Sequence, residues 1–138
     1  MSFNLLAVLL AALSSMIVGT VWFRPRVFGD RWQALTGVDP NKPKRPGVVY
    51  TLSFVMGLLT ATTLSAAASS ALALLGGSAL VVAPIVAAVL WLGFTAATSA
   101  VHYLFEGRSP RVFAINVGHQ LVTVLVMAVI LGLFGFQK

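Results

Sequence analysis

Three stretches of the chain, residues 1–23, 46–105 and 112–137, contain no Asp, Glu, Lys or Arg. A helix of about 20 apolar residues crosses the hydrocarbon core of a bilayer, so each stretch is long enough for at least one crossing. Charged residues make up 9% of the 138 residues and hydrophobic residues 59%, whereas about a quarter of the residues of a soluble domain are charged. These values exclude a water-soluble globular domain and predict a membrane protein.

The uncharged stretches predict four membrane-spanning helices, because the longest is interrupted by the turn-forming tripeptide Gly76-Gly77-Ser78. Lipid offers no hydrogen bonds, so each crossing must satisfy its own backbone as an α-helix. We therefore predict an all-α fold, an integral membrane four-helix bundle forming a single transmembrane domain over residues 1–138. The first apolar run lacks a preceding basic residue and a small-residue cleavage site, so we expect a retained span rather than a signal peptide. The expected helices cover residues 5–23, 48–75, 79–105 and 112–136.

Basic residues are concentrated in the connections that follow the first and third expected helices. Residues 24–47 contain six Lys or Arg and residues 106–111 contain two, whereas the opposite side has only Lys138. Loops rich in Lys and Arg usually remain in the cytoplasm, so we expect a basic cytoplasmic loop at 24–47 and an N-out/C-out orientation. Aromatic residues fall near the same boundary, as in the aromatic belt of membrane proteins: Trp22, Trp32, Tyr50 and Tyr103.

The first half of the basic loop has the spacing of a short amphipathic helix. Val27, Phe28, Trp32 and Leu35 recur at helical spacing while charged residues take other faces, which predicts an interfacial helix in this loop. Three prolines exclude helix from segment 39–47. The candidate residues for binding anionic lipid headgroups are Arg24, Arg26, Arg31, Lys42, Lys44 and Arg45. The loop has two interpretations: a lipid anchor or gate, or a solvated determinant of topology.

Polar side chains recur at helical spacing inside the third and fourth expected spans. A polar stripe is costly against lipid, so we expect the two stripes to face each other or a common interior. They form the candidate intramembrane polar pathway: Trp91, Thr95, Thr98, Ser99 and His102 in the third helix, and Asn116, His119, Gln120 and Thr123 in the fourth. Counting residues along the third span from the Gly77 turn places Trp91 at mid-membrane. We expect its indole N–H to donate there to a hydroxyl of the second span. The candidate acceptors are Thr60, Thr62, Thr63 and Ser65.

Two interpretations of the polar stripes are open. They are either hydrogen-bonding contacts that hold helices together or a pathway for protons or solutes, because imidazole titrates near neutral pH. The spans contain no Asp or Glu, which argues against coupling through an acidic site. The spacing does not place His102, His119 and Glu106 side by side, so neither a metal nor a cofactor is expected. Without a nucleophile, base and orienting group in one set, or a phosphate-binding loop, no enzyme is expected.

Small residues recur at every fourth position of the first and second expected spans. Such spacing allows close approach of helix backbones, within one chain or between copies of it. The residues are Ala7, Ala11, Ser15 and Gly19 in the first helix, and Gly57, Ala61, Ser65 and Ser69 in the second. Cysteine is absent, which excludes disulfides and thiolate chemistry.

Five motifs in order along the chain resemble a bacterial membrane family catalogued as domain of unknown function 1761. They are Gly19-Thr20-Val21-Trp22-Phe23, then Pro25 and Phe28-Gly29 with Trp32, then Trp91-Leu92-Gly93-Phe94, Tyr103-Leu104-Phe105-Glu106-Gly107-Arg108, and Asn116-Val117-Gly118-His119-Gln120-Leu121. The resemblance covers nearly the whole chain. It implies a four-helix membrane protein and carries no activity, substrate or catalytic residue.

The sequence thus predicts a small multi-pass protein of the bacterial plasma (inner) membrane. Our first functional hypothesis is a homo-oligomeric transporter or channel for a small solute or ion, using the polar faces of the third and fourth helices. Several copies are expected because four helices enclose little interior volume. The alternative is a non-transporting structural or accessory protein that binds anionic lipids or a partner through its basic loop. No nucleic-acid partner is expected, because no stacking platform accompanies the basic groups.

Overall fold

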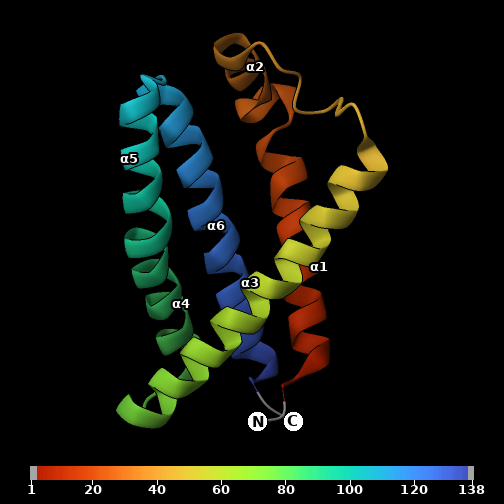
Figure 1. Ribbon diagram of the computed structural model, residues 1–138. Coiled ribbons are helices and arrows are strands. Elements are labelled where there is room, and N and C mark those ends of the chain that lie inside the picture. Colours follow the sequence, from red (N-terminus) through yellow and green to blue (C-terminus); the bar gives the residue numbers. More distant parts are fainter. Residues whose placement is uncertain (1–2, 137–138) are drawn as a thin grey trace.

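The computed structural model describes residues 3–136, and within that range the regular elements are all helices. Four runs are long and apolar enough to cross a membrane, which confirms the prediction of an all-α chain with four such helices. They are α1 (Leu5–Trp22), α3 (Pro46–Leu75), the continuous run of α4 (Ala79–Leu90), η2 (Trp91–Ala96) and α5 (Ala97–Glu106), and α6 (Pro110–Phe134) (Figure 1). Residues 1–2 and 137–138, Lys138 among them, lie outside the described range.

The ends of the long helices are set by capping residues and prolines. The side chain of Asn4 accepts a hydrogen bond from the backbone N–H of Ala7 at 3.2 Å, which caps α1. Helices α3 and α6 begin at Pro46 and Pro110, two residues before the expected starts. Proline suits the first position of a helix because its missing N–H would have no partner there. Gly76, which has a φ of 71°, ends α3.

The basic loop contains two short consecutive helices, η1 (Pro25–Gly29), which is a π turn, and α2 (Asp30–Thr36). Gly37 ends α2 with a φ of 75°, a left-handed conformation that glycine adopts without strain. The segment that follows α2 contacts the end of α1: the side-chain N–H of Asn41 donates to the carbonyl of Phe23, the residue after α1, at 3.0 Å. Helix therefore forms where the apolar spacing predicts it, and the proline-rich segment is irregular up to Arg45.

The tightly packed core lies at one end of the molecule. It is built from the first half of α1, the last part of α3, the first half of α4 and the last part of α6, so it lies at the end that holds both termini (Figure 1). Its buried members are mostly small: Ala7, Val8, Ala11, Ala61, Leu64, Ala68, Ala83, Ala87, Met127, Ala128, Leu131 and Phe136. Alanine lets helix backbones approach closely, which favours packing between helices in lipid.

The opposite end of the bundle is open because α3 crosses the other helices obliquely (Figure 1). At the crossing, a Cβ atom on Gly57 would lie 2.9 Å from the hydroxyl oxygen of Ser15 and 3.5 Å from the carbonyl of Ala12. Beyond this point, the part of α3 from Pro46 to Met56 is exposed except at the half-buried Phe54. The expected small-residue spacing thus produces a close α1–α3 contact within one chain.

Candidate functional site

A cavity of about 730 Å³ lies between α1, the first part of α3 and α6, and we call it the vestibule. Trp32, Pro40 and Asn41 of the basic loop border it at one end. Gly57 and Met127 border it where α3 crosses α1 and the packed core begins. The vestibule is open rather than enclosed. Its remaining lining residues are Ser15, Met16, Gly19, Thr20, Phe23, Val49, Tyr50, Ser53, Met56, Thr60, Thr95, His119, Gln120, Thr123 and Val124.

Most residues of the candidate polar pathway border a cavity. Thr95, His119, Gln120 and Thr123 line the vestibule. A second cavity of about 170 Å³ lies between α5 and α6. It is bordered by the candidates Ser99, Asn116, His119 and Gln120, together with Tyr103, Phe113 and Val117. His119 and Gln120 belong to both linings, so the facing stripes meet at these two positions of α6.

Thr98 and His102 do not join the other candidates, and their expected position on the shared stripe is wrong. Both residues are exposed and border neither cavity. The Thr98 hydroxyl donates to the carbonyl of Phe94 in its own helix at 2.6 Å. The cause is the π turn η2, in which the backbone N–H of Ala97 donates to the carbonyl of Leu92, five residues earlier. One extra residue in a turn shifts everything after it by about 100° around the helix.

Trp91 is bonded to α6 rather than to α3, which corrects the expected acceptor. Its indole N–H donates to the backbone carbonyl of Val117 at 2.9 Å. Two of the expected acceptors, Thr60 and Thr62, instead donate to carbonyls of their own helix at 3.0 and 2.8 Å. Hydroxyls on a helix readily bond to the preceding turn, so α3 satisfies these groups without a partner from another helix.

All three tryptophans of the chain donate their indole N–H groups to consecutive residues of α6. Trp22 donates to the carbonyl of Ile115 at 3.2 Å, and Trp32 donates to the side-chain oxygen of Asn116 at 2.9 Å. The Trp22 ring packs over Gly118, where a Cβ would lie 3.4 Å from its Cζ2 atom, at van der Waals contact. The sequence placed Trp22 and Trp32 in an aromatic belt, and their bonding to one turn of α6 has no signal in the residue pattern.

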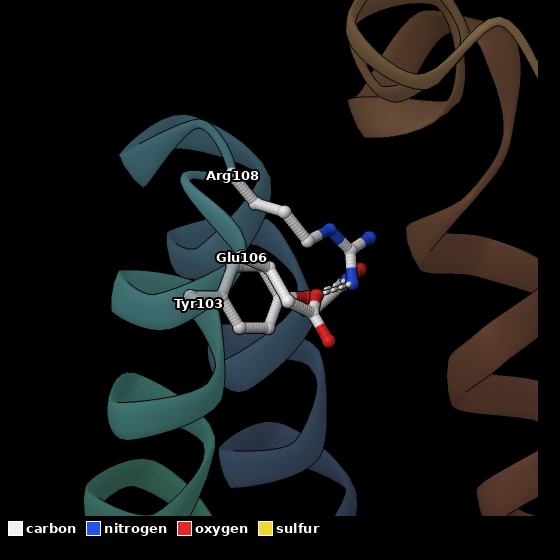
Figure 2. Close-up of polar contacts among 4 residues, drawn as sticks. Tyr103, Glu106 and Arg108 are labelled. Carbon is white, nitrogen blue, oxygen red and sulfur yellow. Dashed lines mark hydrogen bonds and ion pairs between the residues drawn. The ribbon is translucent and has the colours of Figure 1, made fainter.

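Asn116 joins three elements rather than presenting a free polar group. Its amide oxygen accepts from Trp32 of α2, and its amide N–H donates to the hydroxyl of Tyr103 in α5 at 2.6 Å. The Tyr103 ring packs edge-on against Phe113. The guanidinium carbon of Arg108 lies over the Tyr103 ring, 4.5 Å from the ring centre. Figure 2 shows Arg108 beside Glu106, and their nitrogen and oxygen atoms are 3.6 Å apart. Asn116 therefore connects α6 to α2 and α5 at the loop end of the bundle.

His119 is half-buried against the end of α1. Its ring centre lies 5.1 Å from that of Phe23 and 6.2 Å from that of Trp22. Gly19 faces the imidazole, since a Cβ there would lie 3.5 Å from Nε2, at ordinary van der Waals distance. The same Nε2 atom is 3.4 Å from the hydroxyl of Thr123, which also donates to the backbone carbonyl of His119 at 2.8 Å. The imidazole is thus positioned by packing and has hydrogen-bonding capacity beside the cavities.

The six basic residues of the loop are all exposed: Arg24, Arg26, Arg31, Lys42, Lys44 and Arg45. Among residues 3–136, the ion pair found is that of Arg108 with Glu106, so none of the six is paired there with a carboxylate. Asp39, the nearest acid to the lysines in sequence, accepts a hydrogen bond from the backbone N–H of Asn41 at 2.9 Å. The described part of the chain also contains no cluster of three His, Asp or Glu residues that could hold a metal ion.

Residues 6–132 match the model of the family described as "Protein of unknown function (DUF1761)". The matched range begins in α1 and ends in α6, so it includes parts of all four long helices and the residues around both cavities. Comparisons with curated proteins and with solved structures gave no match.

Proposed function

The chain belongs to the DUF1761 family, and from that premise we propose that it is a membrane protein that takes a small solute into the vestibule and moves it across the bilayer. The observation that carries this proposal is the vestibule itself. Its volume of about 730 Å³ lies in the range of roughly 300–1,000 Å³ found for small-molecule sites. Polar side chains inside membrane spans usually face an interior or a water-filled path, and here six of the nine candidate residues border a cavity.

Six polar side chains have a proposed part in this function. Thr95, Gln120 and Thr123 contact the solute, because they line the vestibule. His119 offers a hydrogen-bonding imidazole at the junction of both cavities. Asn116 and Trp91 hold helices in place, because their polar groups are already bonded to neighbouring elements.

The vestibule ends at the packed core, so a path across the membrane must also pass the closed end of the bundle. Small alanine-rich contacts close that end in the structure, so passage requires that α1 and α3 separate near Gly57 or that several copies enclose a path between them. We favour a homo-oligomer, because the polar stripes of one chain end against its own core. Cross-linking in native membranes tests the assembly, and a monomer at every cross-linker concentration would count against it.

We place the protein in a bacterial plasma membrane, with residues 24–45 in the cytoplasm and both termini outside. The orientation rests on the basic residues of the two loops at one end of the bundle. The η1–α2 segment is proposed to lie at the headgroup level, where Trp32 is bonded to α6 while Arg26 and Arg31 remain exposed.

Solute flux into proteoliposomes tests the proposed function. Vesicles with and without the protein are challenged with glycerol, erythritol, urea or potassium chloride, and reswelling is followed by light scattering. We expect faster reswelling with at least one solute, a loss of at least about tenfold in that added rate for His119→Ala and Thr123→Val, and no change for the exposed control Thr98→Val. Equal rates with and without protein for all four solutes would refute transport.

A second candidate function is favoured by the unpaired basic residues of the loop. Six exposed cations beside a membrane attract anionic headgroups by about 1 kcal/mol each, so the protein would instead organise lipids or a partner. Replacing Arg24, Arg26 and Arg31 with Gln should then reduce the anionic lipid that copurifies with the protein, whereas Arg111→Gln at the start of α6 serves as the control. Unchanged lipid retention in the triple variant would remove this candidate.

A further inference from the structure

The vestibule has a lining without formal charge. Among the residues that the structure describes, none of those bordering the cavity is an Asp, Glu, Lys or Arg. Charged residues are missing from the vestibule lining but not from the adjacent loop, which has six exposed basic residues. An ion bound against this lining would exchange hydration water for neutral groups without gaining a charged partner, which is unfavourable.

The same lining is rich in hydrogen-bonding groups that carry no charge. The hydroxyls of Ser15, Thr20 and Ser53 already donate to carbonyls of their own helices at 2.6, 2.9 and 2.7 Å, so their oxygens remain as acceptors. The lining also holds the hydroxyl oxygen of Thr123, the imidazole of His119 and the amide of Gln120. Gln120 makes no side-chain hydrogen bond within residues 3–136, so its amide is available to a molecule in the cavity. These groups can replace the hydration of an uncharged polar solute, but they cannot neutralise an ion.

The apolar part of the lining is adaptable in shape. All the methionines beyond Met1, namely Met16, Met56 and Met127, border the vestibule. The methionine side chain is unbranched and polarisable, and it adjusts to surfaces of different shapes. The aromatic rings of Phe23 and Trp32, whose centres are 5.6 Å apart, stand at the loop end of the same cavity. A ligand with one flat or apolar face would find contacts on this side.

We infer that the vestibule admits uncharged solutes that combine hydrogen-bonding groups with an apolar face, and that it excludes both cations and anions. This inference rests on the proposed function and narrows its substrate class. The decisive observation is the contrast between a neutral lining and the basic loop beside it. Because the three methionine side chains adapt to solutes of different shapes, we expect the site to discriminate between solutes mainly by their charge.

The absence of cysteine from the chain allows a direct test. Thr123→Cys places a thiol in the vestibule, Gln33→Cys places one on the exposed face of α2, and Thr98→Cys places one on the exposed side of α5. Each variant, reconstituted in phosphatidylcholine nanodiscs, is treated with three methanethiosulfonates whose heads are hydroxyethyl, sulfonatoethyl and trimethylammonioethyl. The first is neutral, the second anionic and the third cationic, and modification is followed by mass spectrometry.

We expect the neutral reagent to modify position 123 at least about tenfold faster than either charged reagent, after each rate is divided by that reagent's rate at position 33. We also expect it to react faster at position 123 than at position 98, which excludes access through the lipid. Normalised rates at position 123 that are equal for all three reagents would overturn the charge selection while leaving solute entry intact. A position 123 that no reagent modifies, or neutral rates equal at 98 and 123, would overturn both the inference and the vestibule as a solute site.

Discussion

A polar residue inside a membrane span has a role that depends on its bonding partners, as Asn116 and His119 show. The two residues lie one turn apart on α6, and the sequence pattern places both on the same polar stripe. Both hydrogen-bonding groups of the Asn116 amide are bonded, to Trp32 and to Tyr103. His119 instead borders two cavities, and the one side-chain partner of its ring lies 3.4 Å away. We therefore assign a structural role to the first residue and solute contact to the second.

The structural role of Asn116 predicts a loss of stability in Asn116→Leu. The substitution leaves the indole N–H of Trp32 and the hydroxyl of Tyr103 without their partner, which costs about 1–3 kcal/mol for a buried group. We expect a lower midpoint of thermal unfolding in detergent and stronger quenching of tryptophan fluorescence by acrylamide, since α2 is released from α6. Gln120→Leu is the control, because its side chain makes no hydrogen bond within residues 3–136. Equal midpoints for the two variants would contradict the assignment.

Individual site residues could be predicted from the sequence as far as helical spacing holds. Thr95, His119, Gln120 and Thr123 were identified from spacing and line the vestibule. Thr98 and His102 were misplaced because spacing assumes about 100° per residue, and the π turn at η2 breaks that assumption. The lining residues of α1 and α3 were missed for a different reason: methionines and single hydroxyls in an apolar span resemble any lipid-facing helix.

At the scale of elements, the oblique course of α3 produces the vestibule. Its last part packs in the core through Ala61, Leu64 and Ala68, whereas its first part diverges from α6. Small residues at every fourth position predicted a close contact for α1 and α3, and Gly57 makes that contact. The crossing direction was not predictable, because it depends on which ridges of the two helices fit together. The vestibule, which forms beyond the crossing, was therefore also beyond prediction.

The close contact at Gly57 predicts that Gly57→Val destabilises the protein. The added Cβ would lie 2.9 Å from the hydroxyl oxygen of Ser15, and the O–H group of this residue already donates to the carbonyl of Ala12 at 2.6 Å. Overpacking of this kind costs about 1–3 kcal/mol, and we expect a lower midpoint of thermal unfolding. Gly93→Val is the matched control, because a Cβ on the exposed Gly93 meets no atom within 4 Å. If both variants unfold at the same temperature, α1 and α3 do not pack at this crossing.

At the scale of the whole molecule, the two ends of the bundle differ in packing and in charge. The end with the termini is closed by a core of small residues, and it joins the first and last helices directly. The backbone N–H and side-chain N–H of Asn4 donate to the carbonyls of Phe136 and Phe134 at 3.0 and 2.9 Å. The other end carries the basic loop and the opening beside it. Under the proposed function, a solute would enter at this open end, so the orientation of the bundle would decide the side of the membrane from which it enters.

This asymmetry gives a topology prediction that single cysteines can check in a chain that has none. Four spans place Lys42 and Ser109 on one side and Ser78 on the other, and the basic loop is expected in the cytoplasm. With a membrane-impermeant maleimide on intact cells, Ser78→Cys should be labelled at once, whereas Lys42→Cys and Ser109→Cys should be labelled only after permeabilisation. The reverse pattern would contradict the predicted orientation and would place the vestibule entrance outside the cell. Labelling of all three positions in intact cells would contradict a single orientation.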